Sequence, residues 1–137
     1  MLQPILATLS PLLHPTDRLR WQCLLLLATL VTAMLYPGTR PGISEIFPFL
    51  PWDKLLHATA YGAYAALGWV AMAGRSLWGP VLLAGAIGMM DEGAQYYTPG
   101  RSADFRDIIA DLIGAMLIVL VLRTLQRMEL RQRAPAR

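Results

Sequence analysis

Acids, bases and amides gather in two stretches of this chain, at the borders of long apolar segments. The first stretch reads Asp53-Lys54-x-x-His57-x-x-x-Tyr61. The second covers residues 89–111 (MMDEGAQYYTPGRSADFRDIIAD) and contains five acidic residues, which are Asp91, Glu92, Asp104, Asp107 and Asp111. It also contains Gln95, Arg101 and Arg106. Because charge beside membrane-length apolar runs is costly, these residues are candidates for function or for contacts between helices.

Three kinds of role fit these residue types. A histidine that faces carboxylates from other helices can act as a general acid or base, or can ligate a metal ion. Lys54, Arg101 and Arg106 can instead neutralise neighbouring carboxylates, which would make a salt-bridge lattice that fastens helix ends. A divalent cation is a candidate cofactor, but one imidazole with carboxylates is an unselective ligand set, and the chain contains no His-x-x-x-His pair.

Helical spacing predicts which of these side chains share a face. Spacings of four, four and three place Asp53, His57, Tyr61 and Tyr64 on one face. Asp91 and Gln95 share a face of a second helix, and Asp107, Asp111 and Gly114 share a face of a third. The small-residue pairs Gly62/Ala66, Ala84/Gly88 and Ala110/Gly114 predict close packing between these helices. Three helices are therefore expected to supply polar groups to one layer.

The composition indicates what must position that layer. The chain has 137 residues, of which 55% are apolar and 15% charged, and its apolar residues form long runs separated by Pro- and Gly-rich breaks. This pattern is typical of an integral membrane protein and predicts an all-α, four-span transmembrane bundle without a soluble domain. The expected spans are Trp21–Tyr36, Trp52–Ala73, Leu77–Tyr97 and Asp104–Leu125.

The remaining segments are assigned by composition. Residues 1–20 contain three prolines and are expected to form a short interfacial segment, residues 21–125 the membrane domain, and residues 126–137 a basic cytoplasmic tail. A rival interpretation of the first span is a signal peptide with Val31-Thr32-Ala33 as a weak cleavage site. The single cysteine, Cys23, excludes an intramolecular disulfide. Basic residues flank apolar runs, which favours a membrane-topology role and argues against nucleic-acid binding.

Charge asymmetry predicts the orientation of such a bundle. With four spans both termini lie on one side, which then holds eight basic residues, whereas the other side holds four. The positive-inside rule therefore predicts cytoplasmic termini and an outward-facing polar layer. The outer side carries seven acids, so about three negative charges are left for protons or a bound cation to match.

The motifs in this order resemble those of the VanZ-like family of small bacterial integral membrane proteins, over about residues 50–120. The residues that carry the resemblance are Asp53, Lys54, His57, Tyr61, Asp91, Glu92, Gln95, Pro99, Gly100, Arg101, Asp104, Asp107, Asp111 and Gly114. The position of Asp111 is usually asparagine in that family. The resemblance implies a multi-pass protein of the bacterial plasma membrane. The founding member is associated with resistance to teicoplanin, hence with the cell envelope, but the resemblance supplies no reaction.

Three hypotheses about function follow. In the first, an outward site binds or acts on a lipid-linked envelope precursor within the lipid bilayer. His57 and Glu92 then serve as acid and base, and Asp91 and Asp107 bind a cation or orient His57. Substrate contacts are expected from Asp53, Tyr61, Gln95, Arg101 and Asp111. In the second, the carboxylates form a proton relay of a small transporter. In the third, the polar layer is structural and the protein is a non-catalytic assembly protein.

Overall fold

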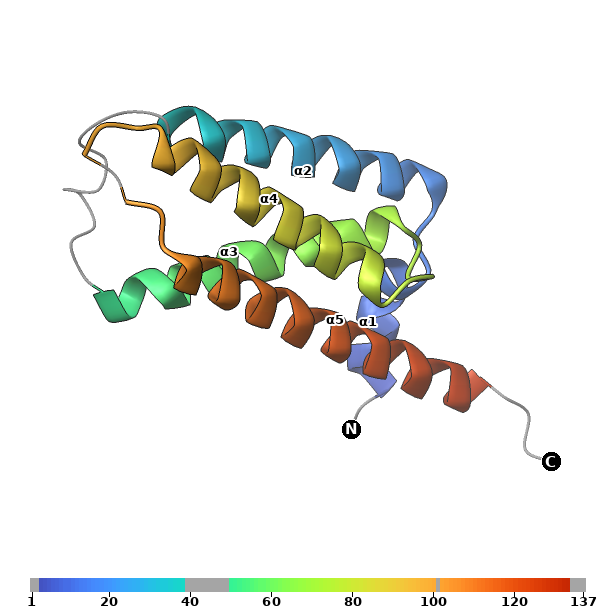
Figure 1. The fold of residues 1–137 in the computed structure, drawn as a ribbon. Coiled ribbons are helices and arrows are strands. Elements are labelled where there is room, and N and C mark those ends of the chain that lie inside the picture. Colours follow the sequence, from blue (N-terminus) through green and yellow to red (C-terminus); the bar gives the residue numbers. More distant parts are fainter. Residues whose placement is uncertain (1–2, 39–49, 101, 134–137) are drawn as a thin grey trace.

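The computed structural model describes residues 3–38, 50–100 and 102–133, and within them the chain forms helices and no strands (Figure 1). The helices are α1 (Gln3–Leu13), α2 (Asp17–Gly38), α3 (Leu50–Ala71), α4 (Trp78–Tyr96) and α5 (Phe105–Arg133). The predicted all-α class is confirmed. Helices α2 to α5 correspond to the four predicted apolar segments, with boundaries shifted by a few residues at most ends.

Helices α2 to α5 run in alternating directions, so that the end of α2, the start of α3, the end of α4 and the start of α5 lie at one end of the molecule (Figure 1). Helix α3 packs most extensively against α5 and also contacts α2 and α4. Helix α1 packs against α5. This arrangement brings the two charged stretches of the sequence to the same end.

Local sequence sets several helix ends. Asp104 caps α5, because its Oδ1 accepts the backbone N–H of Arg106 at 2.9 Å, as expected for an acid at this position. Pro80 lies in the first turn of α4, where its missing N–H costs little. Gly74 follows α3 with a φ of +62° and donates its N–H to the carbonyl of Trp69 at 2.9 Å, which turns the chain toward α4.

The contact between α3 and α5 is very close because glycines lie on both sides of it. A Cβ added to Gly114 of α5 would lie 2.6 Å from the carbonyl carbon of Ala58 and 2.7 Å from its Cα. A Cβ added to Gly62 of α3 would lie 3.2 Å from the carbonyl oxygen of Gly114. The predicted close packing at these small residues is therefore present, and it places the backbones of α3 and α5 in direct contact.

The chain differs from the predicted segments mainly at the carboxyl end. The fourth apolar segment was expected to end at Leu125, but α5 continues to Arg133, so residues 126–133 are not a separate tail. The cause is continued burial of this helix face against α1, on which Leu6 and Leu13 are also buried. The predicted loop between Pro37 and Pro51 falls largely on residues 39–49, which lie outside the described residues.

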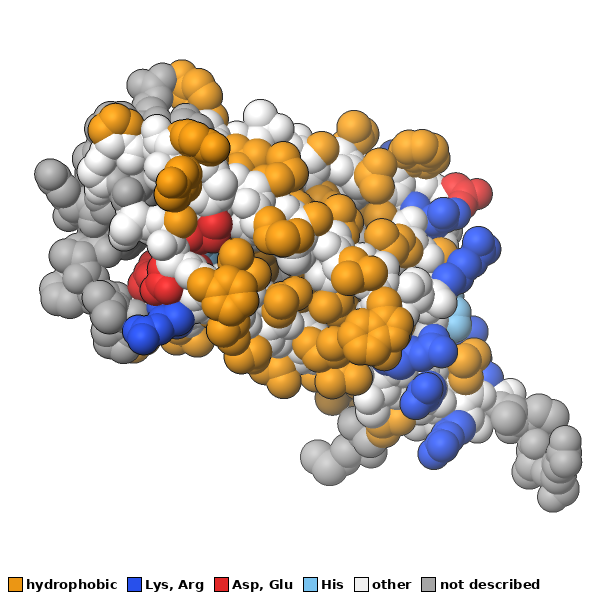
Figure 2. All heavy atoms as spheres, in the orientation of Figure 1, with side chains coloured by type: hydrophobic (Ala, Val, Ile, Leu, Met, Phe, Trp, Pro, Cys, Tyr) orange, Lys and Arg blue, Asp and Glu red, His pale blue; other side chains and the backbone are white. Residues whose placement is uncertain are grey.

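Two of the helices, α2 and α5, are long and apolar enough to cross a membrane by length and composition alone; α2 is near the N-terminus. Large apolar side chains are nonetheless exposed on all four long helices, among them Leu25, Leu56, Leu82 and Leu117. Figure 2 shows apolar side chains over the middle of the molecule, with most of the visible acidic side chains at one end and most of the arginine and lysine at the other.

Candidate functional site

Polar side chains from three helices meet at the end of the molecule where α3 and α5 begin and α4 ends. We call this group the polar cluster, and its members are Asp53, Lys54, His57, Tyr61, Asp91, Glu92, Gln95, Asp104, Asp107 and Asp111. Acidic side chains are gathered at this end in Figure 2. The predicted layer supplied by three helices is therefore present in the structure.

His57 and Asp111 form the central pair of the polar cluster. The Nδ1 of His57 lies 2.9 Å from Oδ1 of Asp111, a hydrogen bond between α3 and α5. The pair is one turn from Gly114 and adjacent to Ala58, so the close backbone contact of these helices sets its length. The carboxylate of Asp111 is fully buried, and a Cβ added to Gly88 of α4 would lie 2.5 Å from its Oδ2. Asp111 is thus enclosed from two sides and holds the imidazole in one orientation.

Lys54 connects the carboxylates at the more exposed, outer end of the polar cluster, which we call its entrance. Its ammonium group donates to Asp107 and, at 3.0 Å, to Asp104, and it lies 3.6 Å from Asp53. One cation therefore bridges α3, the segment before α5, and α5 itself. This is the neutralising contact expected of Lys54 in the lattice interpretation.

Helix α4 contributes the third wall. Gln95 donates to Oδ2 of Asp91 at 3.0 Å, across one helical turn, and the hydroxyl of Tyr61 reaches the same oxygen at 3.4 Å. Glu92 accepts the backbone N–H of Asp104 at 2.7 Å through Oε2. Its other oxygen is buried and has no hydrogen-bond partner among the described residues. Asp91 thus faces α3, whereas Glu92 faces the start of α5.

The exposed fraction of the side chains falls from the entrance of the polar cluster to its inner end. The side chains of Asp53 and Asp104 are 41% exposed, that of His57 is 15% exposed and that of Asp107 is 8% exposed. Tyr61, Asp91, Glu92 and Gln95 are all buried. Asp53, Lys54, Asp104 and, to a smaller extent, His57 are therefore the more exposed members of the polar cluster. Tyr61, Gln95 and Asp111, expected to contact substrate, lie below them and are bonded to other protein groups.

Asp104 lies between helices α4 and α5, at the entrance. The backbone N–H of Arg106 and then the ammonium group of Lys54 hold the pKa of Asp104 below its usual value. The entrance is therefore charged over a wide pH range. Arg101, predicted to hold an anionic group, lies outside the described residues.

A second polar group at the opposite end was missed at the sequence level. Gln126 and Glu129 of α5 are buried under α1. Gln126 donates to the carbonyl of Leu13 at 3.0 Å, and His14 lies 3.2 Å from Glu129. We call this group the α1–α5 junction. A signal for it exists, since Val119, Leu122, Gln126 and Glu129 continue one spacing of three and four beyond the apolar run.

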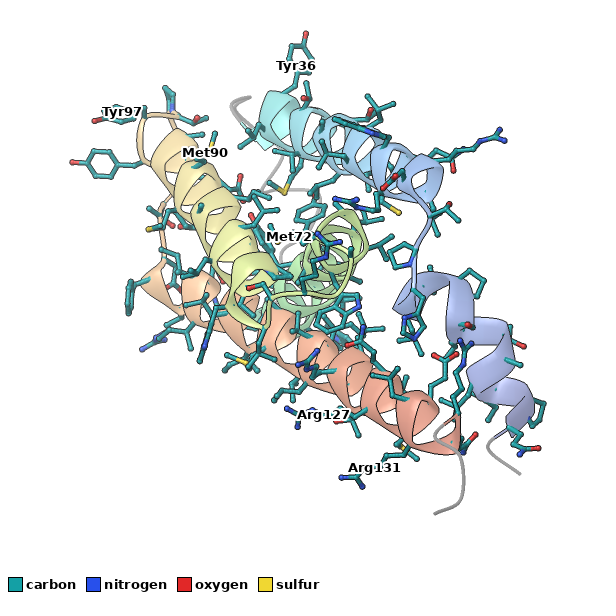
Figure 3. The ribbon with its side chains drawn as sticks, turned by 90° about the vertical axis from the view of Figure 1, so that its right-hand side faces the viewer. Tyr36, Met72, Met90, Tyr97, Arg127 and Arg131 are labelled. Atoms are coloured by element: carbon teal, nitrogen blue, oxygen red, sulfur yellow. The ribbon has the colours of Figure 1, made fainter. Side chains whose placement is uncertain are left out.

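Two basic residues near this junction face outward, whereas Arg123 and Arg133 donate to Gln126 and Glu129. Arg127 and Arg131 are exposed, and Figure 3 shows both pointing away from the bundle on α5. Tyr36 and Tyr97, which flank the acidic end, also point outward in this view. Aromatic and basic side chains at the two ends of an apolar surface are the arrangement found at membrane boundaries.

Comparison with known proteins gives one match. The family model described as VanZ/LLP1 matches residues 22–126, which include every member of the polar cluster. No curated protein and no solved structure matches the chain significantly.

Proposed function

The chain belongs to the VanZ/LLP1 family, and from this membership we propose that it is a multi-pass protein of the bacterial plasma membrane whose polar cluster binds, and acts on, a lipid-linked cell-envelope precursor. The observation that carries the proposal is the His57–Asp111 pair. A buried carboxylate holds one imidazole nitrogen, and the imidazole is partly exposed at the entrance.

The membrane placement is supported by length and by surface. Helices α3 and α4 have 22 and 19 residues, which corresponds to about 33 and 29 Å and matches a hydrocarbon core of about 30 Å. Their polar residues lower the hydropathy of these helices but are turned inward to the cluster. The outward residues Leu55, Leu56 and Leu82 are more than half exposed, which suits a lipid environment and not water.

The proposed orientation places the polar cluster outside the cell. The end of the molecule that carries the α1–α5 junction also holds the turn between α3 and α4, which contains Arg75, and the outward-pointing Arg127 and Arg131, in agreement with cytoplasmic termini under the positive-inside rule. Envelope precursors that are anchored to lipid present their polar groups at the outer boundary of the membrane. The entrance formed by Asp53, Lys54 and His57 lies at that depth in the proposed arrangement.

His57 is the proposed acid–base group. When Nδ1 carries the proton that is donated to Asp111, the lone pair of Nε2 is free to take a proton from water or from a substrate hydroxyl. Asp111 stabilises the imidazolium that results, because its carboxylate is fully buried and cannot turn to solvent. Lys54 is positioned to neutralise a developing negative charge at the entrance. The proposed reaction class is hydrolysis or group transfer.

A structural role is the second candidate, and Lys54 is the observation that favours it. Its contacts with Asp104 and Asp107 tie the start of α3 to the start of α5 without any ligand. A proton relay through a single copy is less well supported. Along α5, the buried apolar residues Val119 and Leu122 separate the polar cluster from the α1–α5 junction.

Replacement of His57 distinguishes a site from a lattice. His57→Gln should retain the melting temperature of the purified protein within a few degrees and abolish the effect of its expression on sensitivity to envelope-directed antibiotics. His14→Gln is the matched control, since it changes the other histidine at the opposite end, and should leave that effect intact. If His57→Gln protein is stable and fully effective, the acid–base proposal is wrong. If it fails to fold, the structural role is favoured.

A further inference from the structure

We infer that the entrance of the polar cluster is a binding site for a first-row divalent metal ion, held by Asp53, Nε2 of His57 and Asp107. Each of these residues offers one ligand atom, and these atoms lie within 4.8 Å of one another. Two come from α3 and one from α5. This inference goes beyond the proposed function. Nε2 of His57 holds either the ion or a proton at one time, so His57 acts as acid and base only in the metal-free protein.

The imidazole is oriented as a metal ligand requires. Histidines that bind metals usually donate their other ring N–H to a carboxylate, which fixes the tautomer and directs the lone pair at the ion. Here Nδ1 of His57 is hydrogen-bonded to Oδ1 of Asp111 at 2.9 Å. The other ring nitrogen, Nε2, lies 3.9 Å from Oδ1 of Asp53. That separation is too long for a hydrogen bond. With Nε2 unprotonated, the space between it and the carboxylate of Asp53 would be a place for a cation.

Glu92 provides independent support for positive charge at this place. It is 5% exposed, and its Oε1 is buried without a hydrogen-bond partner among the residues that the structure describes. Its Oε2 accepts the backbone N–H of Asp104, whose side chain contacts Lys54, so Glu92 lies behind the same group of side chains. Burying a carboxylate with an unsatisfied oxygen is unfavourable unless a cation compensates for its charge. Lys54 contacts Asp104 and Asp107 and lies 3.6 Å from Asp53, so its single charge is shared among several carboxylates other than Glu92.

The ligand set indicates the kind of ion. One imidazole with carboxylate oxygens suits Zn²⁺ or Mn²⁺ better than Mg²⁺ or Ca²⁺, which take oxygen ligands almost exclusively. Ligand bonds of about 2.0–2.2 Å place neighbouring ligand atoms roughly 3.0–3.5 Å apart. The gap of 3.9 Å between Nε2 of His57 and Oδ1 of Asp53 therefore has to close by about half an ångström. Asp53 can make this movement because its side chain is 41% exposed.

The contacts of Lys54 indicate that metal binding at this site is weaker than at a permanent metal centre. The ammonium group of Lys54 is bonded to Asp107 and lies 3.6 Å from Asp53, so it uses two of the three ligand residues. An incoming ion must compete with this charge, and binding should be reversible. Removing the charge of Lys54 should therefore strengthen metal binding, although it removes two contacts that a purely structural cluster needs.

The test measures metal binding to the full chain, purified in detergent and stripped with EDTA. Titration calorimetry with ZnCl₂ and with MnCl₂ should give one ion per chain for the wild type. Lys54→Met should bind at least tenfold more tightly, and Asp107→Asn at least tenfold more weakly. Asp17→Asn, which removes an exposed acid at the other end of the chain, should match the wild type.

If the Lys54 or Asp107 variants do not fold, a spectroscopic measurement on the wild-type protein still tests the inference. Electron paramagnetic resonance of Mn²⁺ bound to wild-type protein should show coupling to one imidazole nitrogen, and the coupling should persist in His14→Gln. Absence of stoichiometric binding, or binding without the nitrogen coupling, would overturn the inference. The same conclusion follows if Lys54→Met folds but binds neither ion more tightly than the wild type.

Discussion

Replacing Gly114 with alanine tests whether the close contact of α3 and α5 holds the His57–Asp111 pair together. The added Cβ would lie 2.6 Å from the carbonyl carbon of Ala58, whereas ordinary contacts begin at 3.4 Å. The carbonyl oxygen of Ala58 would lie closer still, and the three nearest atoms are all backbone atoms of α3, which cannot rotate away. The two helices must therefore separate at this point by about 0.8 Å or more.

The size of the effect follows from this displacement. If the 2.9 Å bond between His57 and Asp111 lengthens equally, it reaches about 3.7 Å and is lost. Overpacking costs about 1–3 kcal/mol, and loss of the hydrogen bond about 1.5–3 kcal/mol, offset by about 1 kcal/mol from the better helix propensity of alanine. We expect a net loss of about 1.5–5 kcal/mol, which corresponds to a melting temperature lower by about 5–20 °C.

Thermal unfolding of the purified variants in one detergent measures the loss. Gly93→Ala is the matched control, because nothing lies within 4 Å of the added Cβ on α4; it should be neutral or slightly stabilising. Gly62→Ala, whose Cβ would lie 3.2 Å from the carbonyl oxygen of Gly114, should fall between the two. The chain has two histidines, so the imidazole NMR signals of ¹⁵N-histidine-labelled protein report the His57 bond directly.

The reasoning fails if Gly114→Ala has the same melting temperature as the wild type and leaves the His57 signals unchanged. It also fails if Ala58→Gly restores Gly114→Ala, because removing a side chain cannot relieve a clash with backbone atoms.

Three further predictions concern other parts of the molecule. Gln126→Leu should lower the free energy of unfolding by about 1–3 kcal/mol, because the buried carbonyl of Leu13 loses its donor; exposed Arg127→Gln should have no effect, and equal stability of the two variants would contradict the α1–α5 junction. The pKa of Asp104 is lowered from 3.8, so its carboxylate stabilises the fold fully above that pH and progressively less as pH falls through the folded-state pKa; the stability difference between wild type and Asp104→Asn should therefore be constant at neutral pH and shrink in acid, and a difference that persists at low pH would refute this. Topology reporters fused at Arg75 and at Gly100 should report opposite sides of the membrane, and the same side for both would rule out the four-span arrangement.

Two contacts between residues a few positions apart follow from helical spacing and from residue type. Asp91 and Gln95, which the spacing places on one helix face, are joined by a 3.0 Å hydrogen bond, and Asp104 caps α5 through its bond to the backbone N–H of Arg106. Both contacts join residues two to four positions apart, so the rise and rotation of the helix determine them. The family assignment was equally accessible, since it depends on the order of polar motifs along the chain.

The sequence was less informative about the ends of elements and their depth. The apolar run ends near Leu125, which placed the end of the fourth segment there, yet α5 continues because α1 covers Gln126 and Glu129. Exposure was also inaccessible. Tyr61, Gln95 and Asp111 have the residue types of substrate-binding groups, and only their burial among other helices shows that they lie beneath the entrance.

The sequence by itself determined that this chain is helical, which polar residues share a helix face, and that these faces belong to one layer. Only the tertiary structure determined which acidic side chain bonds to which basic side chain. His57 has Asp53 one turn away on its own helix, yet its hydrogen bond goes to Asp111, 54 positions along the chain. Lys54 likewise reaches Asp104 and Asp107 across the helix contact. The physical reason is that such pairs depend on the distance between two backbones, and here Gly114 against Ala58 sets that distance.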